Sequence, residues 1–187
     1  MAVTKSNNEK FNIFYSKCEM DNSNPIPEIT LKRLFGQYRD IYNLGVDLWN
    51  TGDYTDCKIL NKFEMDLNNV ISRDLGYRRY LLDELVKMVI IKFFEDRDSN
   101  ETGELSHLTR KNDHLILQFT SSNITITSNG YVGISSLIMG KEYVLPLSCT
   151  DSIPEDFIKN ATENLISVIL HEKDGYCELR IVCNNCV

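Results

Sequence analysis

The sequence lacks the long apolar run that a membrane-spanning helix requires. Such a helix needs roughly 20 largely uncharged residues, whereas the longest apolar run, residues 86–94, contains Lys87 and Lys92. The N-terminal residues 1–10 are polar and include no apolar stretch of the kind that marks a secretory signal. These two absences predict a soluble, intracellular protein located in the cytoplasm, or in the host cytoplasm if the protein is viral.

An excess of positive charge is also lacking, because 20 Lys and Arg residues stand against 27 Asp and Glu residues and the formal net charge is −7. An acidic protein repels phosphate groups, so a broad nucleic-acid-binding face and attraction to anionic membranes are disfavoured. One local cluster, Tyr77-Arg78-Arg79-Tyr80, could grip a phosphate or stack against a base. It lies near acidic residues at a predicted helix start, so a nucleic-acid-binding module with Arg78 and Arg79 as anion contacts is the second alternative.

The six cysteines do not show the regular spacing of a zinc site. Cys183 and Cys186 form a C-x-x-C pair, to which His171 could be added. Alternation along the predicted last strand, however, places Cys177 and Cys183 on one face as small core residues. Without a secretory signal, the cysteines are expected as thiols in a reducing compartment. We therefore predict no bound metal.

The acidic segment 95–104 does not match the ligand spacing of a calcium-binding loop. Asp96, Asp98 and Asn100 occupy the first, third and fifth positions of an EF-hand loop. The sixth position must be a glycine and the twelfth a bidentate glutamate, but Glu101 and His107 stand there. We therefore interpret the segment as a solvated acidic loop.

Short catalytic motifs are missing as well. The segment 133–137, GISSL, begins like a nucleophile elbow, but Leu137 stands where the second glycine belongs. No glycine-rich stretch leads into the Lys-Ser or Lys-Thr of a phosphate loop. The histidines, His107, His114 and His171, each lie at a predicted element boundary. We assign no catalytic residue and no cofactor, and a hydrolase-like enzyme with a site assembled from distant residues is the first alternative.

The composition that is present, 42% hydrophobic and 25% charged, is that of an ordinary globular protein. With 187 residues and no long linker, the chain is predicted to form a single domain over residues 1–187. It has a helix-rich part over residues 1–95, the acidic loop 95–104 and a strand-rich part over residues 113–187.

Hydrophobic periodicity predicts the elements of both parts. Helices are expected over residues 28–48, about 57–71 and about 77–94, after a first strand at residues 11–15 that extends toward Cys18 and Met20. Strands are expected over residues 115–120, 124–127, 131–134, 143–147, 165–170 and 176–183. Ser152, Pro154 and Glu155 are expected to open a short helix that runs to about residue 163. Asn129-Gly130 and Asp174-Gly175 favour tight hairpin turns, because these residue types tolerate positive φ.

This order of elements indicates an α+β fold. The N-terminal strand and three helices are expected to pack on a mainly antiparallel C-terminal sheet, with the short helix before the last hairpin. We note that helices come first and strands follow, which is the arrangement that favours α+β over an alternating α/β fold.

The predicted third helix is apolar over more of its circumference than one buried stripe requires. Met88, Ile90, Ile91 and Phe94 are therefore expected either to lie between packed layers or to contact a partner, and both alternatives stay open. Without a catalytic motif, the sequence favours a non-catalytic protein-interaction or assembly protein, such as a complex subunit or a viral structural or accessory protein. Its partner is expected to be another protein or a second copy in a homo-oligomer.

Overall fold

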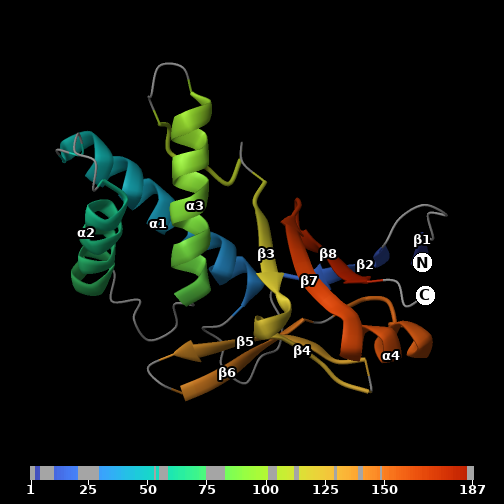
Figure 1. Ribbon diagram of the computed structural model, residues 1–187. Coiled ribbons are helices and arrows are strands. Elements are labelled where there is room, and N and C mark those ends of the chain that lie inside the picture. The colour runs from blue at the N-terminus through green and yellow to red at the C-terminus, as the bar shows by residue number, and fades with distance from the viewer. Residues whose placement is uncertain are drawn as a thin grey trace. The chain divides into compact units, whose positions relative to one another are not determined.

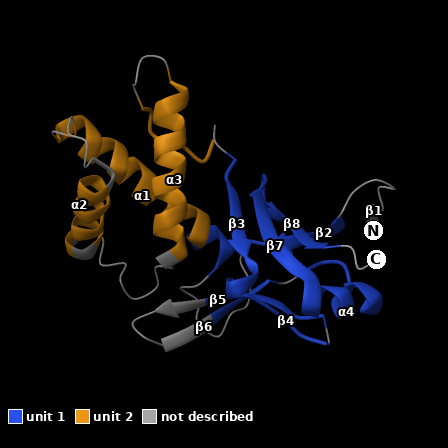
Figure 2. Cartoon of the chain, viewed as in Figure 1, with its two compact units in different colours: residues 1–33, 114–136, 142–187 blue, residues 34–113, 137–141 orange. Residues whose placement is uncertain are grey.

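The computed structural model describes residues 3–4, 11–20, 30–52, 54, 59–74, 83–100, 105–111, 114–128, 130–138, 141–147 and 149–184. The chain forms two compact units (Figure 2). Unit 1 comprises residues 1–33, 114–136 and 142–187, and unit 2 comprises residues 34–113 and 137–141. Helices and antiparallel sheets occur together, which confirms the predicted α+β class. One domain over residues 1–187 stays a prediction.

The larger sheet of unit 1 has five strands in the order β1-β2-β8-β7-β3, and neighbouring strands run antiparallel (Figure 1). The strands are β1 (Val3–Thr4), β2 (Phe11–Glu19), β3 (Ile116–Thr120), β7 (Leu165–Glu172) and β8 (Tyr176–Asn184). The predicted N-terminal strand is therefore confirmed, and it pairs with the last strand of the chain.

A second sheet has three strands in the order β4-β5-β6. They are β4 (Ile124–Ile126), β5 (Val132–Ile138) and β6 (Lys141–Leu147), and a 3-10 turn over Ser121–Asn123 connects β3 to β4. The strands predicted for this half of the chain are found, although β5 and β6 extend beyond the predicted ranges. β4 and β5 form the first predicted hairpin, with Ile126 opposite Val132.

Glycines with positive φ close both hairpins, as their sequences predict. Gly130 has φ +80° and its amide donates to the Thr127 carbonyl at 2.9 Å. Gly175 has φ +84°, and the Lys173 amide donates to the Tyr176 carbonyl at 3.0 Å. Residues with a Cβ rarely adopt this backbone conformation, so the glycines set where the strands turn. Residue 129 lies outside the described residues.

Helix α4 (Glu155–Asn164) precedes the last hairpin, as predicted, and packs on one face of the larger sheet. Its buried side chains are Phe157, Ile158 and Ala161. The Phe157 ring lies 5.6 Å from the ring of Phe14 on β2. Burial alternates along β2 and β8, so this inner face holds the core of unit 1 and the other side chains point to an outer face.

Unit 2 consists mainly of α1 (Leu31–Thr51), α2 (Ile59–Asp74) and α3 (Asp83–Ser99). Aromatic rings cluster in its core among buried aliphatic side chains. The rings of Trp49 and Tyr54 stack with centroids 5.2 Å apart, and those of Phe63 and Phe93 lie 4.6 Å apart. None of the helices within the described part of the chain combines the length and apolar character that crossing a bilayer demands.

Helix α3 continues to Ser99 and so extends into the segment predicted as an acidic loop. Its last turn has specific partners. The Tyr42 hydroxyl donates a hydrogen bond to Asp96 at 2.8 Å, Lys92 pairs with Asp96, and the Ser99 hydroxyl donates to the Glu95 carbonyl at 2.7 Å. These contacts satisfy groups that a solvated loop would expose to water. The predicted helix starts at residues 28 and 77, and Glu101, lie outside the described residues.

Candidate functional site

The outer face of the larger sheet is the face opposite α4. Strand pairing sets its rows: Tyr15 lies opposite Arg180, and Arg180 lies opposite Ile169 on its other side. We define the outer face by the following alternate side chains: Phe11, Ile13, Tyr15, Lys17 and Glu19 of β2, Ile116, Gln118 and Thr120 of β3, Ile169 and His171 of β7, and Tyr176, Glu178, Arg180, Val182 and Asn184 of β8.

Apolar side chains occupy much of the outer face. Ile116 is 60% exposed and Phe11 is 42% exposed. Ile13 and Val182 are half-buried and lie opposite each other on adjacent strands, and Ile169 is half-buried on the next strand. An antiparallel sheet that faces water on one side usually carries polar residues there. A gathering of apolar side chains on this side is therefore informative in a way that a single exposed residue is not.

Basic side chains of the outer face lie over its aromatic rings. Lys17 Nζ is 4.8 Å from the centre of the Tyr176 ring, and the Arg180 guanidinium carbon is 5.6 Å from the centre of the Tyr15 ring. Cation–π attraction holds these long side chains along the sheet. The face therefore combines aliphatic, tyrosine and arginine side chains, and aromatic residues and arginine are enriched in protein interfaces.

Electrostatic contacts fix the charges of the outer face. Arg180 Nε donates to Glu178 Oε1 at 2.7 Å, and this bond lowers the pKa of Glu178. Lys173 Nζ lies 3.1 Å from His171 Nε2. Burial, and then the charge of Lys173, lower the pKa of His171 below its ordinary value. At neutral pH Glu178 is negative and His171 is neutral, and the Glu178 carboxylate lies beside the Arg180 guanidinium on the face.

The four candidate interface residues of the sequence lie on α3 in unit 2. Ile91 is 60% exposed, and the exposed residues Lys87 and Glu95 flank it one helical turn away on either side. Met88 and Ile90 are half-buried. The wide apolar circumference of the helix is thus divided between core and surface, and a role for these residues in binding stays a prediction.

Phe94, the fourth of these residues, is half-buried in the aromatic core of unit 2. Its ring lies 5.6 Å from that of Phe63 and 6.1 Å from that of Trp49. The Arg97 guanidinium carbon lies 4.6 Å from the centre of the Phe94 ring. Phe94 therefore packs within unit 2 and offers a partner only part of its surface.

The candidate anion contacts Arg78 and Arg79 lie outside the described residues. Arg73, in the last turn of α2, is exposed. On the outer face of the sheet, Glu19 and Glu178 accompany the basic side chains and oppose a nucleic-acid backbone. The nucleic-acid alternative stays a prediction.

Metal-ligating side chains do not gather within the described ranges, where no group of three or more His, Cys, Asp or Glu could hold a metal ion. Asp96 and Asp98, the first ligands of the EF-hand comparison, belong to α3, and Asp98 pairs with Arg97. His107 Nε2 lies 2.9 Å from Asp47 Oδ1. Cys186 of the C-x-x-C pair lies outside the described residues.

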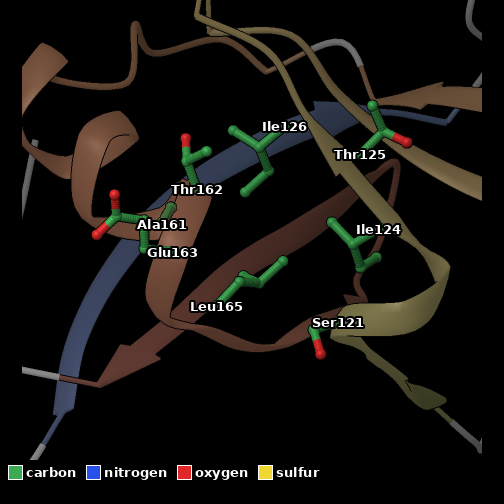
Figure 3. Close-up of a pocket in the computed structure, with 8 residues that line it drawn as sticks. All are labelled: Ser121, Ile124, Thr125, Ile126, Ala161, Thr162, Glu163 and Leu165. Atoms are coloured by element: carbon green, nitrogen blue, oxygen red, sulfur yellow. The ribbon is translucent and has the colours of Figure 1, made fainter.

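A pocket of about 380 Å³ lies between α4 and β4 (Figure 3). It is lined by Ser121, Ile124, Thr125, Ile126, Ala161, Thr162, Glu163 and Leu165. Beside it, the Ser135 hydroxyl of the elbow-like segment lies 3.0 Å from the Thr125 hydroxyl. The lining offers hydroxyl groups and one carboxylate, Glu163, and contains no histidine, cysteine or lysine. We assign the pocket no reaction.

Two thiols that are far apart in the sequence lie in contact in unit 1. The Sγ atoms of Cys18 and Cys149 are 3.7 Å apart. Cys18 is buried and Cys149 is half-buried. Sequence spacing gives no sign of this pair, because its members are 131 residues apart. The outer face of the sheet, by contrast, has a signal in the sequence, because residues alternate along β2 and along β8. Only the pairing of β2 with β8 shows that the outward-facing residues of the two strands form one surface.

Comparison with known proteins adds no assignment, because no protein-family model matches the sequence and no curated protein matches it either.

Proposed function

We propose that this chain is a non-catalytic assembly protein that self-associates through the outer face of its larger sheet. The observation that carries the proposal is the accumulation of apolar and aromatic side chains on that face, with Ile116 60% exposed at one side and Phe11 42% exposed at the other. Each Å² of apolar surface removed from water contributes about 25 cal/mol. Covering these side chains in an interface would therefore favour association.

The charges of the outer face favour a second copy of the chain as the partner. A two-fold interface pairs a surface with itself, so a charged surface of this kind must carry both signs. Lys17 and Arg180 lie on the outer face together with Glu19 and Glu178. Opposite charges can therefore meet across a two-fold axis although the net charge is −7. A strongly basic or strongly acidic partner would leave half of these groups facing like charge.

The predicted interface on α3 is less suited to this role. Ile91 is the exposed member of the set and lies between Lys87 and Glu95, while Met88, Ile90 and Phe94 are half-buried. Single apolar residues of this kind are ordinary on protein surfaces. We therefore place the association on the sheet and use α3 as the competing site in the test.

Sedimentation velocity over a range of concentrations tests the proposal. Ile116→Glu should weaken self-association at least about tenfold, because burying an unpaired carboxylate costs well over 1.4 kcal/mol. Met65→Glu is the matched control, since Met65 is 66% exposed on α2. Its dissociation constant should equal that of the wild type. Ile91→Glu should behave like the control.

Two results would contradict the proposal. One is a wild-type chain that remains monomeric at every concentration. The other is a chain whose association is abolished by Ile91→Glu and unaffected by Ile116→Glu. Melting temperatures of all variants should stay close to the wild-type value, because each substituted side chain is largely exposed.

A further inference from the structure

Cys18 and Cys149 meet where the segment after β6 joins the edge of β2. The two residues are partners in an isolated antiparallel bridge, and their Sγ atoms are 3.7 Å apart. The Thr150 amide donates to the Lys17 carbonyl at 2.8 Å. This bond joins the residue before Cys18 to the residue after Cys149. The cysteines are therefore a non-hydrogen-bonded pair, the kind in which side chains approach most closely.

This pairing suits a disulfide. Cα atoms of a non-hydrogen-bonded pair are typically about 4.5 Å apart, within the range of about 4.4–6.8 Å that disulfides span. To form the bond, the sulfurs must close from 3.7 Å to about 2.05 Å. Rotation of the two side chains can supply that movement while β2 keeps its place in the sheet.

Cys177 is a third thiol, opposite Cys18 on β8. The amide and carbonyl of Cys18 point away from Cys149 and toward β8, so Cys18 and Cys177 form a hydrogen-bonded pair, whose side chains are further apart. The Cys177 thiol donates to the Glu178 carbonyl at 3.6 Å. Burial raises the pKa of Cys177 to about 12. Cys149 is therefore the preferred partner of Cys18.

Cys149 is the member of the pair that reacts first. It is half-buried, whereas Cys18 is 1% exposed. A hydrogen bond from the Cys18 thiol lowers the pKa of Cys149. The same bond, together with burial, raises the pKa of Cys18. The thiolate is the nucleophilic form of cysteine, so Cys149 supplies the attacking sulfur.

We propose that Cys18 and Cys149 form a reversible disulfide when the protein meets hydrogen peroxide. The Cys149 thiolate attacks one peroxide oxygen, the O–O bond breaks, and the released hydroxide takes a proton to become water, which leaves Cys149 as a sulfenic acid. The Cys18 sulfur then attacks the Cys149 sulfur and loses its proton, and the sulfenic hydroxyl departs as a second water. Two thiols lose two electrons in total, and the peroxide gains them. A dithiol reductant reverses the bond by exchange.

The disulfide would tie together parts of unit 1 that the sequence separates. β2 precedes unit 2 in the chain, and the segment after β6 follows it. The bond closes a loop whose ends are 131 residues apart. Closing a long loop restricts the unfolded chain most, so the oxidised protein should melt several degrees higher than the reduced protein.

Peptide mapping of the full-length chain tests the pairing. Trypsin releases Cys18 in the peptide 18–32 and Cys149 in the peptide 142–159. After one molar equivalent of peroxide, alkylation of free thiols and digestion without reductant, these two peptides should be linked as the main product. Dithiothreitol should separate them. The oxidised protein should melt above the reduced protein, and this difference should vanish with the bond.

Serine variants provide the controls. Cys149→Ser should remove the linked peptide and the shift in melting temperature, whereas Cys177→Ser should keep both. The reduced Cys149→Ser protein should melt as the reduced wild type does, because the substituted side chain is half-buried. A main link to the peptide 174–180, which contains Cys177, would overturn the proposal. So would oxidation of Cys149 to a sulfinic acid without any link.

Discussion

Individual cysteines of this chain differ in reactivity according to the face on which they lie. Cys177 and Cys183 are on the inner face of β8, each 0% exposed. Burial raises the pKa of Cys177 to about 12 and that of Cys183 to about 11. Sequence alternation placed both in the core correctly. It could not place Cys149, because the partner that lowers its pKa belongs to a distant strand.

Thiol labelling of the native protein measures these differences. Cys149 should react faster than Cys177 and Cys183, and its rate should level off at a lower pH than that of a free cysteine, because the pKa of Cys149 is lowered and its thiolate fraction saturates earlier. Mass spectrometry after timed alkylation gives each rate. Equal rates at Cys177 and Cys149 would indicate a register of β8 shifted by one residue, since such a shift moves every side chain to the opposite face.

At the scale of elements, the local sequence determines where the hairpin turns form. Gly175 has φ +84°, so Gly175→Ala should lower the free energy of unfolding by about 1–2 kcal/mol. Gly36→Ala is the matched control: Gly36 lies within α1, and an added Cβ there meets nothing within 4 Å. It should raise stability by about 0.5–1 kcal/mol. In urea denaturation, the change in the free energy of unfolding should have opposite signs in the two variants. Equal changes would contradict the turn assignment.

The elements themselves follow from local signals in the sequence, whereas the contacts between distant parts of the chain do not. The two hairpin turns and α4 follow from glycine positions and periodicity within short windows. The end of α3 does not, because Asp96 is held by the Tyr42 hydroxyl, 54 residues earlier in the chain. The outer face required the order β2-β8-β7-β3, which brings the first and last long strands together. No local pattern encodes that order.

The sequence also bears on metal content at the scale of the whole molecule. The chain matches neither the ligand spacing of an EF-hand nor that of a zinc site. Purified full-length protein is therefore expected to contain no stoichiometric zinc, and added calcium should leave its melting temperature unchanged. Elemental analysis that finds about one metal ion per chain would overturn this expectation, because a structural zinc ion contributes strongly to folding.

Assembly through the outer face is the central claim at this scale, and methyl NMR with a soluble paramagnetic agent tests it most directly. The agent broadens methyl signals that solvent can reach. As protein concentration rises, the methyl groups of Ile116, Ile169 and Val182 should become protected, while those of Met65 and Ile91 should stay accessible. Unchanged broadening at Ile116 over all concentrations, or protection at Ile91 instead, would contradict the account.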